Sequence, residues 1–214
     1  MATTTKQTTA NESGPAVSAS SEDALRANFY GLLARVLARP MDEDSLELMR
    51  GLAGHDDASP LGEAIATFGK LCQRTPRVKA EEEFTQLFYG VGAGGEISPY
   101  ASLYLTGLVY DKPLADLRGD MARIGIAPAE DNSEPEDHIA SLCEMMHGLL
   151  TGALGEQGNG REEARVFFDR HLAPWAGKMF ADLERAEAAS LYMPVGTIGR
   201  LFMEIEREAY EMAA

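Results

Sequence analysis

Two segments of this sequence combine aromatic, acidic and imidazole side chains around a proline. The first reads Glu-Ile-Ser-Pro-Tyr-Ala-Ser-Leu-Tyr from Glu96 to Tyr104, and the second reads Glu-Pro-Glu-Asp-His-Ile-Ala-Ser-Leu-Cys-Glu-Met-Met from Glu134 to Met146. Each lies at the predicted edge of a helix, because proline is tolerated in the first turn of a helix but not in its interior. Such side chains can transfer protons, hold a metal ion or line a recognition surface.

Metal binding is the first alternative. Glu144 and His147 have the Glu-x-x-His spacing that puts two ligands on one helix face in di-iron bundles. Those sites need a second Glu-x-x-His and further glutamates on facing helices, and the sequence has no second copy. We therefore expect no metal and no cofactor, with His147 as a helix-surface residue. A helical metal-binding oxidoreductase subunit built on these two residues is the rival hypothesis.

Nucleotide binding and nucleophilic catalysis have less support. The run from Gly90 to Gly95 contains Gly-x-Gly-x-x-Gly, but a dinucleotide site needs that loop between a strand and a helix. Here the preceding segment is predicted to be helical and Pro99 follows closely, so a flexible loop is the better interpretation. No local motif marks a serine or cysteine nucleophile. Asp137 and His138 without such a partner do not form a catalytic triad.

Two interpretations of the second segment remain open. Glu134, Glu136 and Asp137 suit the positive end of a helix dipole, so helix capping with a hydrogen-bonded His138 would explain all four residues. The other interpretation is a binding role. The pattern alone favours capping, since a lone histidine seldom establishes function.

The aromatic residues of the first segment are ambiguous in the same way. Tyr100, Leu103 and Tyr104 recur at helical spacing and could be core residues. Two phenols and Ser102 beside an acidic helix start could equally line a pocket for an amphipathic or basic peptide.

Length and charge limit the class of protein that carries these segments. At 214 residues, with 45% apolar and 25% charged residues, the chain can bury one good core. The formal net charge is −15, and Lys6 and Glu12 cancel within the N-terminal segment. The folded body therefore carries the acidic excess, which disfavours a nucleic-acid partner and favours a cationic one such as a basic peptide.

The sequence also predicts a cytoplasmic location. Cys72 and Cys143 lie far apart without a Cys-x-x-Cys motif, which is typical of reduced, buried thiols. Residues 1–20 lack the basic and apolar regions of an export signal, so we expect a disordered tail followed by one domain over 21–214. No apolar run approaches the ~20 residues of a membrane-spanning helix, and we expect no stable membrane insertion.

Apolar residues recur at three- and four-residue steps from residue 21 onward, which predicts helices almost throughout. The first is capped by Ser20 or Ser21 and ends before Pro40. Pro135 is predicted to open a long helix. The remaining expected helices are 43–52, 61–72, 77–88, 100–110, 111–124, 161–173, 174–191 and 194–212, with the Pro135 helix running to about 153. The expected fold is all-α, an irregular bundle of about ten helices in a single domain.

Read in order, three strings resemble the TorD/DmsD/NarJ family of redox-enzyme maturation chaperones. They are Glu-Phe-Thr-Gln-Leu-Phe-Tyr-Gly (83–90) running into Ser-Pro-Tyr-Ala-Ser-Leu-Tyr (98–104), Glu-Pro-Glu-Asp-His-Ile-Ala (134–140), and Phe-Phe-Asp-Arg-His-Leu-Ala-Pro-Trp (167–175). The likeness covers about residues 24–208, and the Glu-Pro-x-Asp-His-Ile-Ala string is the most specific part of it.

The resemblance implies a TorD-like all-helical fold without enzymatic turnover. It implies binding of the twin-arginine signal peptide or apo form of a molybdoenzyme catalytic subunit precursor, which delays export until the cofactor is inserted. The residues carried over by motif position as a signal-peptide-binding site are Tyr100, Ser102, Tyr104, Pro135, Glu136, Asp137 and His138. Some members form homodimers by exchanging helices or bind guanine nucleotides, and nothing in this sequence shows either.

The sequence departs from the family pattern at two places. Ala101 stands where an acidic residue is frequent, and Ser-Leu-Cys-Glu-Met-Met (141–146) replaces a more acidic, Phe-containing continuation. These departures bear on the identity of the client. The Cys-Glu-Met continuation is most similar to chaperones of formate dehydrogenases, and a dimethyl sulfoxide reductase-type client is the alternative.

Overall fold

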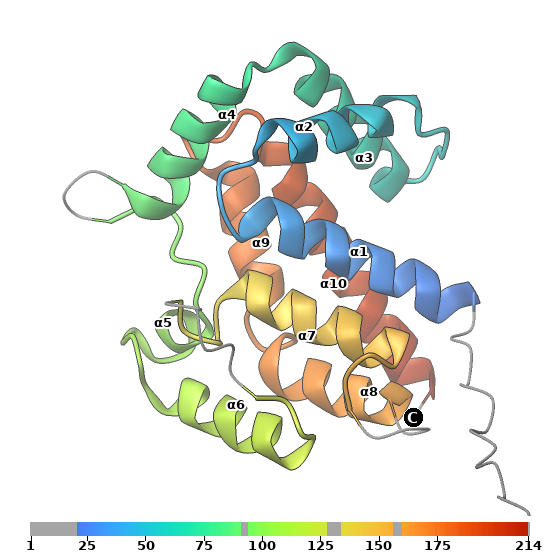
Figure 1. Ribbon diagram of the computed structural model, residues 1–214, viewed down its shortest axis with the longest axis vertical. Coiled ribbons are helices and arrows are strands. Elements are labelled where there is room, and N and C mark those ends of the chain that lie inside the picture. The colour runs from blue at the N-terminus through green and yellow to red at the C-terminus, as the bar shows by residue number, and fades with distance from the viewer. Residues whose placement is uncertain (1–20, 91–93, 128–133, 156–159, 214) are drawn as a thin grey trace, which may run out of the picture.

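The computed structural model describes residues 21–90, 94–127, 134–155 and 160–213. Within these ranges the fold contains ten α-helices and no strand, which confirms the all-α expectation (Figure 1). The predicted tail (1–20) and the centre of the glycine-rich loop (91–93) lie outside the described residues. The helices are α1 (Ser21–Leu37), α2 (Glu43–Arg50), α3 (Pro60–Arg74), α4 (Arg77–Phe84), α5 (Ala101–Thr106), α6 (Lys112–Arg123), α7 (Ile139–Thr151), α8 (Gly160–His171), α9 (Ala176–Arg185) and α10 (Met193–Ala213).

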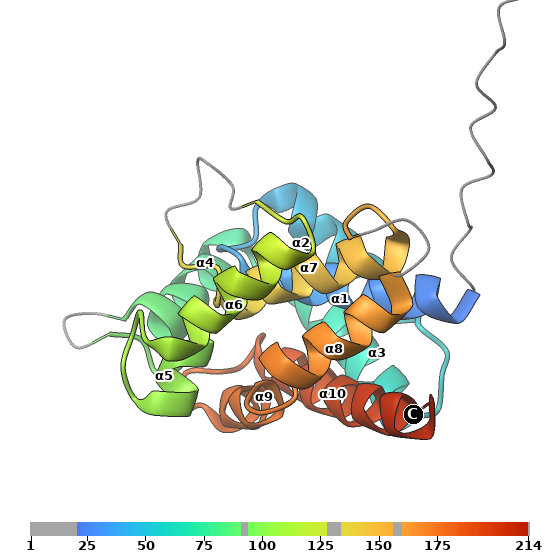
Figure 2. The same ribbon diagram turned by 90° about the horizontal axis from the view of Figure 1, so that it is seen from below.

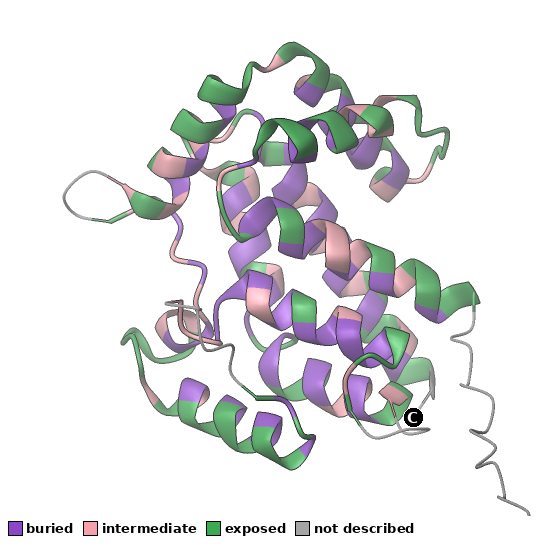
Figure 3. Cartoon of the chain, viewed as in Figure 1, coloured by how far each residue is buried: buried purple, intermediate pink, exposed green. Residues whose placement is uncertain are grey.

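The core forms where α1 packs along α7 and where α10 packs along α9 and α3. Helix α8 covers another side of α7, while α5 and α6 lie at one side of the bundle (Figures 1 and 2). Inward faces are buried and outward faces exposed along most helices (Figure 3). The largest fully buried side chains include Tyr30, Phe68, Phe84, Phe168, Phe180, Tyr192 and Phe202.

Helix α7 begins later than predicted. Pro135 does not open it; the first helical residue is Ile139, and His138 is the N-cap with an extended backbone. The residues from Pro135 to His138 instead form a turn in which the N–H of His138 donates to the carbonyl of Pro135 at 3.1 Å. This turn brings the chain into an extended conformation beside the first motif segment.

Other predicted helix boundaries differ from the structure. Helix α5 ends at Thr106, because Gly107 adopts a left-handed conformation with φ 78°. The helix predicted over 174–191 is reduced to Ala176–Arg185. Helix α4 ends at Phe84 and continues as a π-helical turn over Thr85–Tyr89, a local distortion that is frequent near functional sites.

Both cysteines are free and buried, as expected. Burial raises the pKa of Cys72 to about 12 and raises that of Cys143 still further. Neither thiol therefore forms the reactive thiolate near neutral pH. None of the described helices has the length and apolar character needed to span a membrane.

A buried ion pair joins α1 to α10. The Arg26 guanidinium donates to both carboxylate oxygens of Glu206, at 2.6 and 2.9 Å, and the Tyr30 hydroxyl donates to the same carboxylate at 2.9 Å. Glu206 is 0% exposed, so its charge depends on these three hydrogen bonds rather than on water.

We expect Glu206→Gln to lower the free energy of unfolding by about 3 kcal/mol, because the partly buried Arg26 charge loses its closest carboxylate and keeps only the longer pair with Asp23 at 3.5 Å. Chemical denaturation measures the change. The control is Glu81→Gln, which removes an exposed pair with Arg77 and should cost less than about 1 kcal/mol. Equal effects of the two substitutions would contradict the importance of the α1–α10 pair.

Candidate functional site

The two motif segments lie side by side and run antiparallel where α5 and α7 begin (Figure 1). The N–H of Ala101 donates to the carbonyl of Asp137 at 3.0 Å, and the N–H of Ile139 donates to the carbonyl of Pro99 at 2.8 Å. These bonds satisfy backbone groups that the helix starts would otherwise leave unpaired. The pairing therefore fixes the two segments relative to each other.

Asp137 reinforces this pairing with its side chain. Its carboxylate accepts a hydrogen bond from the N–H of Ser102 at 2.8 Å, so it caps the first turn of α5. Asp137 is 2% exposed and Ser102 is 0% exposed. Asp137 is thus a helix-capping residue, as one of the two interpretations expected. It caps α5, through a residue 35 positions earlier in the sequence, and not α7, which follows it.

His138 caps α7. Its Nδ1 accepts from the N–H of Ala140 at 3.1 Å, which places the ring proton on Nε2. Burial lowers the pKa of His138, outweighing the opposite effect of Glu134 and Asp137. The imidazole is therefore neutral at pH 7, and its edge contacts the Tyr100 ring with the centroids 5.1 Å apart.

Tyr100 completes the centre of the site. Its hydroxyl donates to the Glu134 carboxylate at 2.5 Å, and burial together with that carboxylate raises the pKa of the phenol. Pro135 is half-buried beside it. Glu136 pairs with Arg118 of α6 at 2.7 Å and keeps 14% of its side chain exposed.

Tyr104 lies apart from this group. Its hydroxyl donates to Asp182 of α9 at 3.2 Å, and its ring contacts Trp175 with the centroids 5.4 Å apart. Lys178 lies over the same ring. The structure therefore brings together six of the seven predicted residues and places the seventh against α9. Their role in peptide binding stays a prediction.

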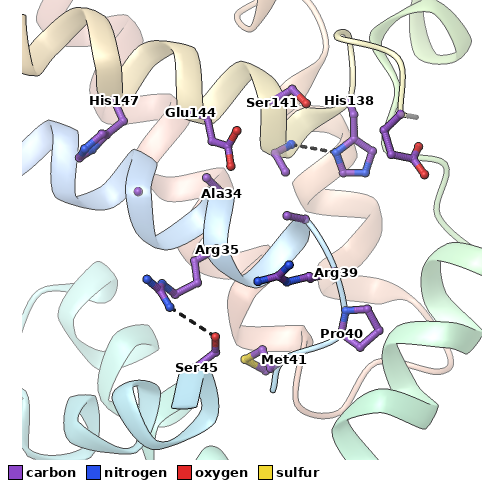
Figure 4. A pocket seen from close by; sticks show the side chains of 14 residues that line it. Ala34, Arg35, Arg39, Pro40, Met41, Ser45, His138, Ser141, Glu144 and His147 are labelled. Atoms are coloured by element: carbon purple, nitrogen blue, oxygen red, sulfur yellow. Dashed lines mark hydrogen bonds between the residues drawn. The ribbon is translucent and has the colours of Figure 1, made fainter. Parts of the chain in front are cut away.

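A cavity of about 690 Å³ adjoins the paired segments (Figure 4). One wall comes from the end of α1 and the turn to α2, and the other from α7. The residues that the sequence did not reveal as neighbours of the site are Arg35, Arg39, Met41 and Ser45. The spacing of Arg35 and Arg39 by four residues could have indicated a positively charged surface. The sequence around them does not show that α1 lies beside α7, so their place in the cavity could not be predicted.

Glu144 and His147, the Glu-x-x-His pair, also line this cavity. His147 Nδ1 lies 2.8 Å from the carbonyl of Ala27 in α1, which makes it a hydrogen-bonded link between helices. Among the described residues no group of three or more His, Cys, Asp or Glu side chains is placed to hold a metal ion.

Comparison with known proteins decides the family. Residues 55–181, more than half of the chain, match a family model described as nitrate reductase delta subunit. The chain belongs to this family. It is the NarJ/TorD family of redox-enzyme maturation chaperones that the motif strings predicted.

Individual relatives agree with this assignment. A chaperone protein TorD from Vibrio parahaemolyticus is 24% identical over 199 residues, covering 85% of this chain and 92% of that protein. The TorD chaperone of Photobacterium profundum is 28% identical over 152 residues, covering 65% and 70%. The chain is accordingly a maturation chaperone and not an enzyme.

A solved structure confirms the fold. The crystal structure of a redox enzyme maturation protein from Archaeoglobus fulgidus matches with a TM-score of 0.53 and 20% identity. The match covers 84% of this chain and 94% of that protein. The irregular helical bundle of the chaperone is therefore the fold of that maturation protein.

We expect Asp137→Ala to lower the free energy of unfolding of the chaperone by about 1–3 kcal/mol, because the buried N–H of Ser102 loses its acceptor. Asp137→Asn keeps an acceptor oxygen in place and should cost less. Thermal and chemical denaturation give both values. Unchanged stability of Asp137→Ala would contradict the positioning role and favour direct ligand contact.

The free energy of unfolding should fall as the pH is lowered below about 6.5. In the folded chaperone, burial holds the pKa of His138 and of His171 below the ordinary histidine value of about 6.5, so only the unfolded chain gains these protons at first. Each histidine contributes at most about 1.4 kcal/mol per pH unit, and the loss ends at its folded pKa. Denaturation at a series of pH values measures the slope.

The control for this slope is His138→Asn, since asparagine is a good N-cap that does not titrate. Its slope should be shallower than that of the wild type over the same pH interval. An identical slope would show that His138 does not titrate differently on unfolding.

Proposed function

We propose that this chaperone acts in the cytoplasm on a molybdoenzyme catalytic subunit precursor, binding its twin-arginine signal peptide, its apo form or both. It thereby assists cofactor insertion and delays export. The favoured client is a formate dehydrogenase, with a dimethyl sulfoxide reductase-type subunit as the alternative. The observation that carries the proposal is the pairing of the two motif segments, which groups Tyr100, Glu136 and His138 on one side of the fold.

An exposed apolar turn lies next to this group. Leu108 is 63% exposed and Tyr110 is 70% exposed, in a turn where α5 ends and α6 has not begun. Only the six-residue helix α5 separates the turn from the paired segments, since Tyr100 is the N-cap of α5 and Gly107 is its C-cap. Contiguous exposed apolar side chains are typical of interaction sites. The large exposed apolar residues of this stretch are Leu105, Leu108, Val109 and Tyr110.

The two parts of the proposed surface would contribute differently. Burying the apolar stretch of a signal peptide against this turn supplies about 25 cal/mol per Å². Exposed ion pairs with the peptide arginines add only about 0.2–1 kcal/mol each. The charge of −15 would therefore govern selection and encounter rate more than affinity.

The predicted residues then divide into two roles. Tyr100, Pro135, Glu136 and His138 keep some accessible surface and would contact the peptide. Ser102 and Asp137 would act beneath them by holding the segments together. Tyr104, bonded to α9, would contact the peptide only at the edge of the site.

Titration with a synthetic peptide that carries Arg-Arg before an apolar stretch tests the proposal. We expect binding about fivefold tighter than for the Lys-Lys version, because a guanidinium pairs with carboxylates through two bonds whereas an ammonium acts as a point charge. Calorimetry measures both affinities. Equal binding of the two peptides, or none, would remove the twin-arginine claim.

Substitution of the apolar turn provides the matched variant for this titration. Leu108→Ser should weaken binding of the Arg-Arg peptide about tenfold through lost apolar burial. Leu25→Ser is the control, because Leu25 is 62% exposed in the first turn of α1, at the opposite end of that helix from the cavity. Both variants should keep the wild-type melting temperature.

A further inference from the structure

The cavity beside the paired segments has two walls of opposite charge. On α7, Ser141, Glu144 and His147 follow at three-residue steps and so share one helix face. On the opposite wall stand Arg35 and Arg39, near the end of α1. Figure 4 shows Glu144 directed from α7 toward the α1 wall.

Glu144 differs from the other carboxylates around the site. Glu134 accepts from Tyr100, Glu136 pairs with Arg118 and Asp137 accepts from Ser102. Within the part of the chain that the structure describes, Glu144 has no hydrogen bond and no ion pair, although it lines a cavity of about 690 Å³. It therefore retains the full acceptor capacity of a carboxylate, which matches the planar fork of a guanidinium.

The arginines on the opposite wall do not neutralise it. Arg35 turns toward α2, where its Nη1 lies 3.4 Å from the Ser45 hydroxyl. Arg39 also lies near the start of α2, where hydrogen bonds from Ser45 and, to a smaller extent, the charges of Arg39 and Arg35 lower the pKa of Asp42. No ion pair joins either of them to Glu144 within the described ranges of the chain. All three residues line the cavity of about 690 Å³, which has room for a further side chain.

The cavity is also continuous with the proposed peptide surface. Glu134 and His138 line it, and the same two residues contact Tyr100 from the other side. A chain leaving the cavity past these residues would meet Tyr100 and then the apolar turn after α5. That order, charge first and apolar surface next, matches a peptide in which an arginine pair precedes an apolar stretch.

We propose that Glu144 receives an arginine side chain of the bound peptide inside the α1–α7 cavity. This inference rests on the proposed function and assigns the arginine to a residue outside the seven predicted ones. Glu134 lies on the same path, while Arg35 and Arg39 face the backbone carbonyl oxygens of the peptide. Asp137 is left to position the segments from below.

The experiment combines a protein variant with a peptide variant. Wild type, Glu144→Gln and Glu208→Gln are each titrated with the Arg-Arg peptide and with its Gln-Gln version. Glu208 is an exposed α10 residue outside the cavity. The substitution Glu208→Gln therefore removes one negative charge from the protein without changing the cavity. Glu144→Gln should weaken Arg-Arg binding about fivefold, as expected for a partly exposed ion pair, and leave Gln-Gln binding unchanged. Glu208→Gln should keep the wild-type preference.

Three other results would each be decisive. If wild type prefers Arg-Arg and Glu144→Gln keeps that full preference, the assignment of Glu144 is wrong while the proposed function stands. If wild type shows no preference, the proposed recognition of a twin-arginine signal peptide itself fails, and the assignment of Glu144 fails with it. If Arg39→Gln abolishes binding of both peptides and Glu144→Gln changes neither, the cavity holds an anionic group instead, and the assignment is again overturned.

Discussion

The backbone pairing between Pro99–Ala101 and Asp137–Ile139 is the constraint on which the rest of the site depends. It uses the N–H and carbonyl groups at the starts of α5 and α7, which would otherwise cost free energy when buried. Because Asp137 contributes both its carbonyl and its carboxylate, one buried residue fixes the start of α5. The carbonyl of Pro99 does the same for the start of α7 by accepting from the N–H of Ile139. The capping role of His138 and the orientation of Tyr100 follow from this geometry, since both side chains project from the paired backbone.

The cavity depends on a second constraint, the position of α1. Its first half is tied to α10 by the buried pair of Arg26 and Glu206, and His147 holds it to α7 through the carbonyl of Ala27. Its last turn carries Arg35 at the cavity wall, and Arg39 follows just after the helix ends at Leu37, where the chain turns toward α2. The contacts of Arg26 and Ala27 therefore fix the first half of α1, and the end of α1 places the positive charge of Arg35 at the cavity wall.

Periodicity predicted the fold well because every helix buries one face, and the apolar spacing of such a face repeats whatever the neighbouring helix is. It predicted boundaries less well. Pro135 suits a first helical turn, but the competing backbone pairing holds 135–138 in a turn and delays α7 to Ile139. A capping role for Asp137 was predicted, but its partner was not. The partner is the N–H of Ser102, and the sequence around residue 137 does not indicate that Ser102 lies beside it. Arg35 and Arg39 were missed for the same reason: their place in the site arises only from the packing of α1 against α7.

A maturation chaperone must bind its client selectively and then release it, and the balance between rigid and exposed parts of the surface suits both needs. The paired segments are held by buried hydrogen bonds, so little conformational entropy is lost when a ligand arrives. The groups proposed to contact the ligand keep only part of their surface exposed, with the Glu136 side chain at 14% and His138 at 8%. His138 is neutral at pH 7 because burial lowers its pKa. Ion pairs at such a surface are weak and screened by salt. The preference for arginine is therefore modest, about fivefold for such exposed pairs, and the total affinity stays limited by the small apolar area of the turn after α5. A client held in this way can be released.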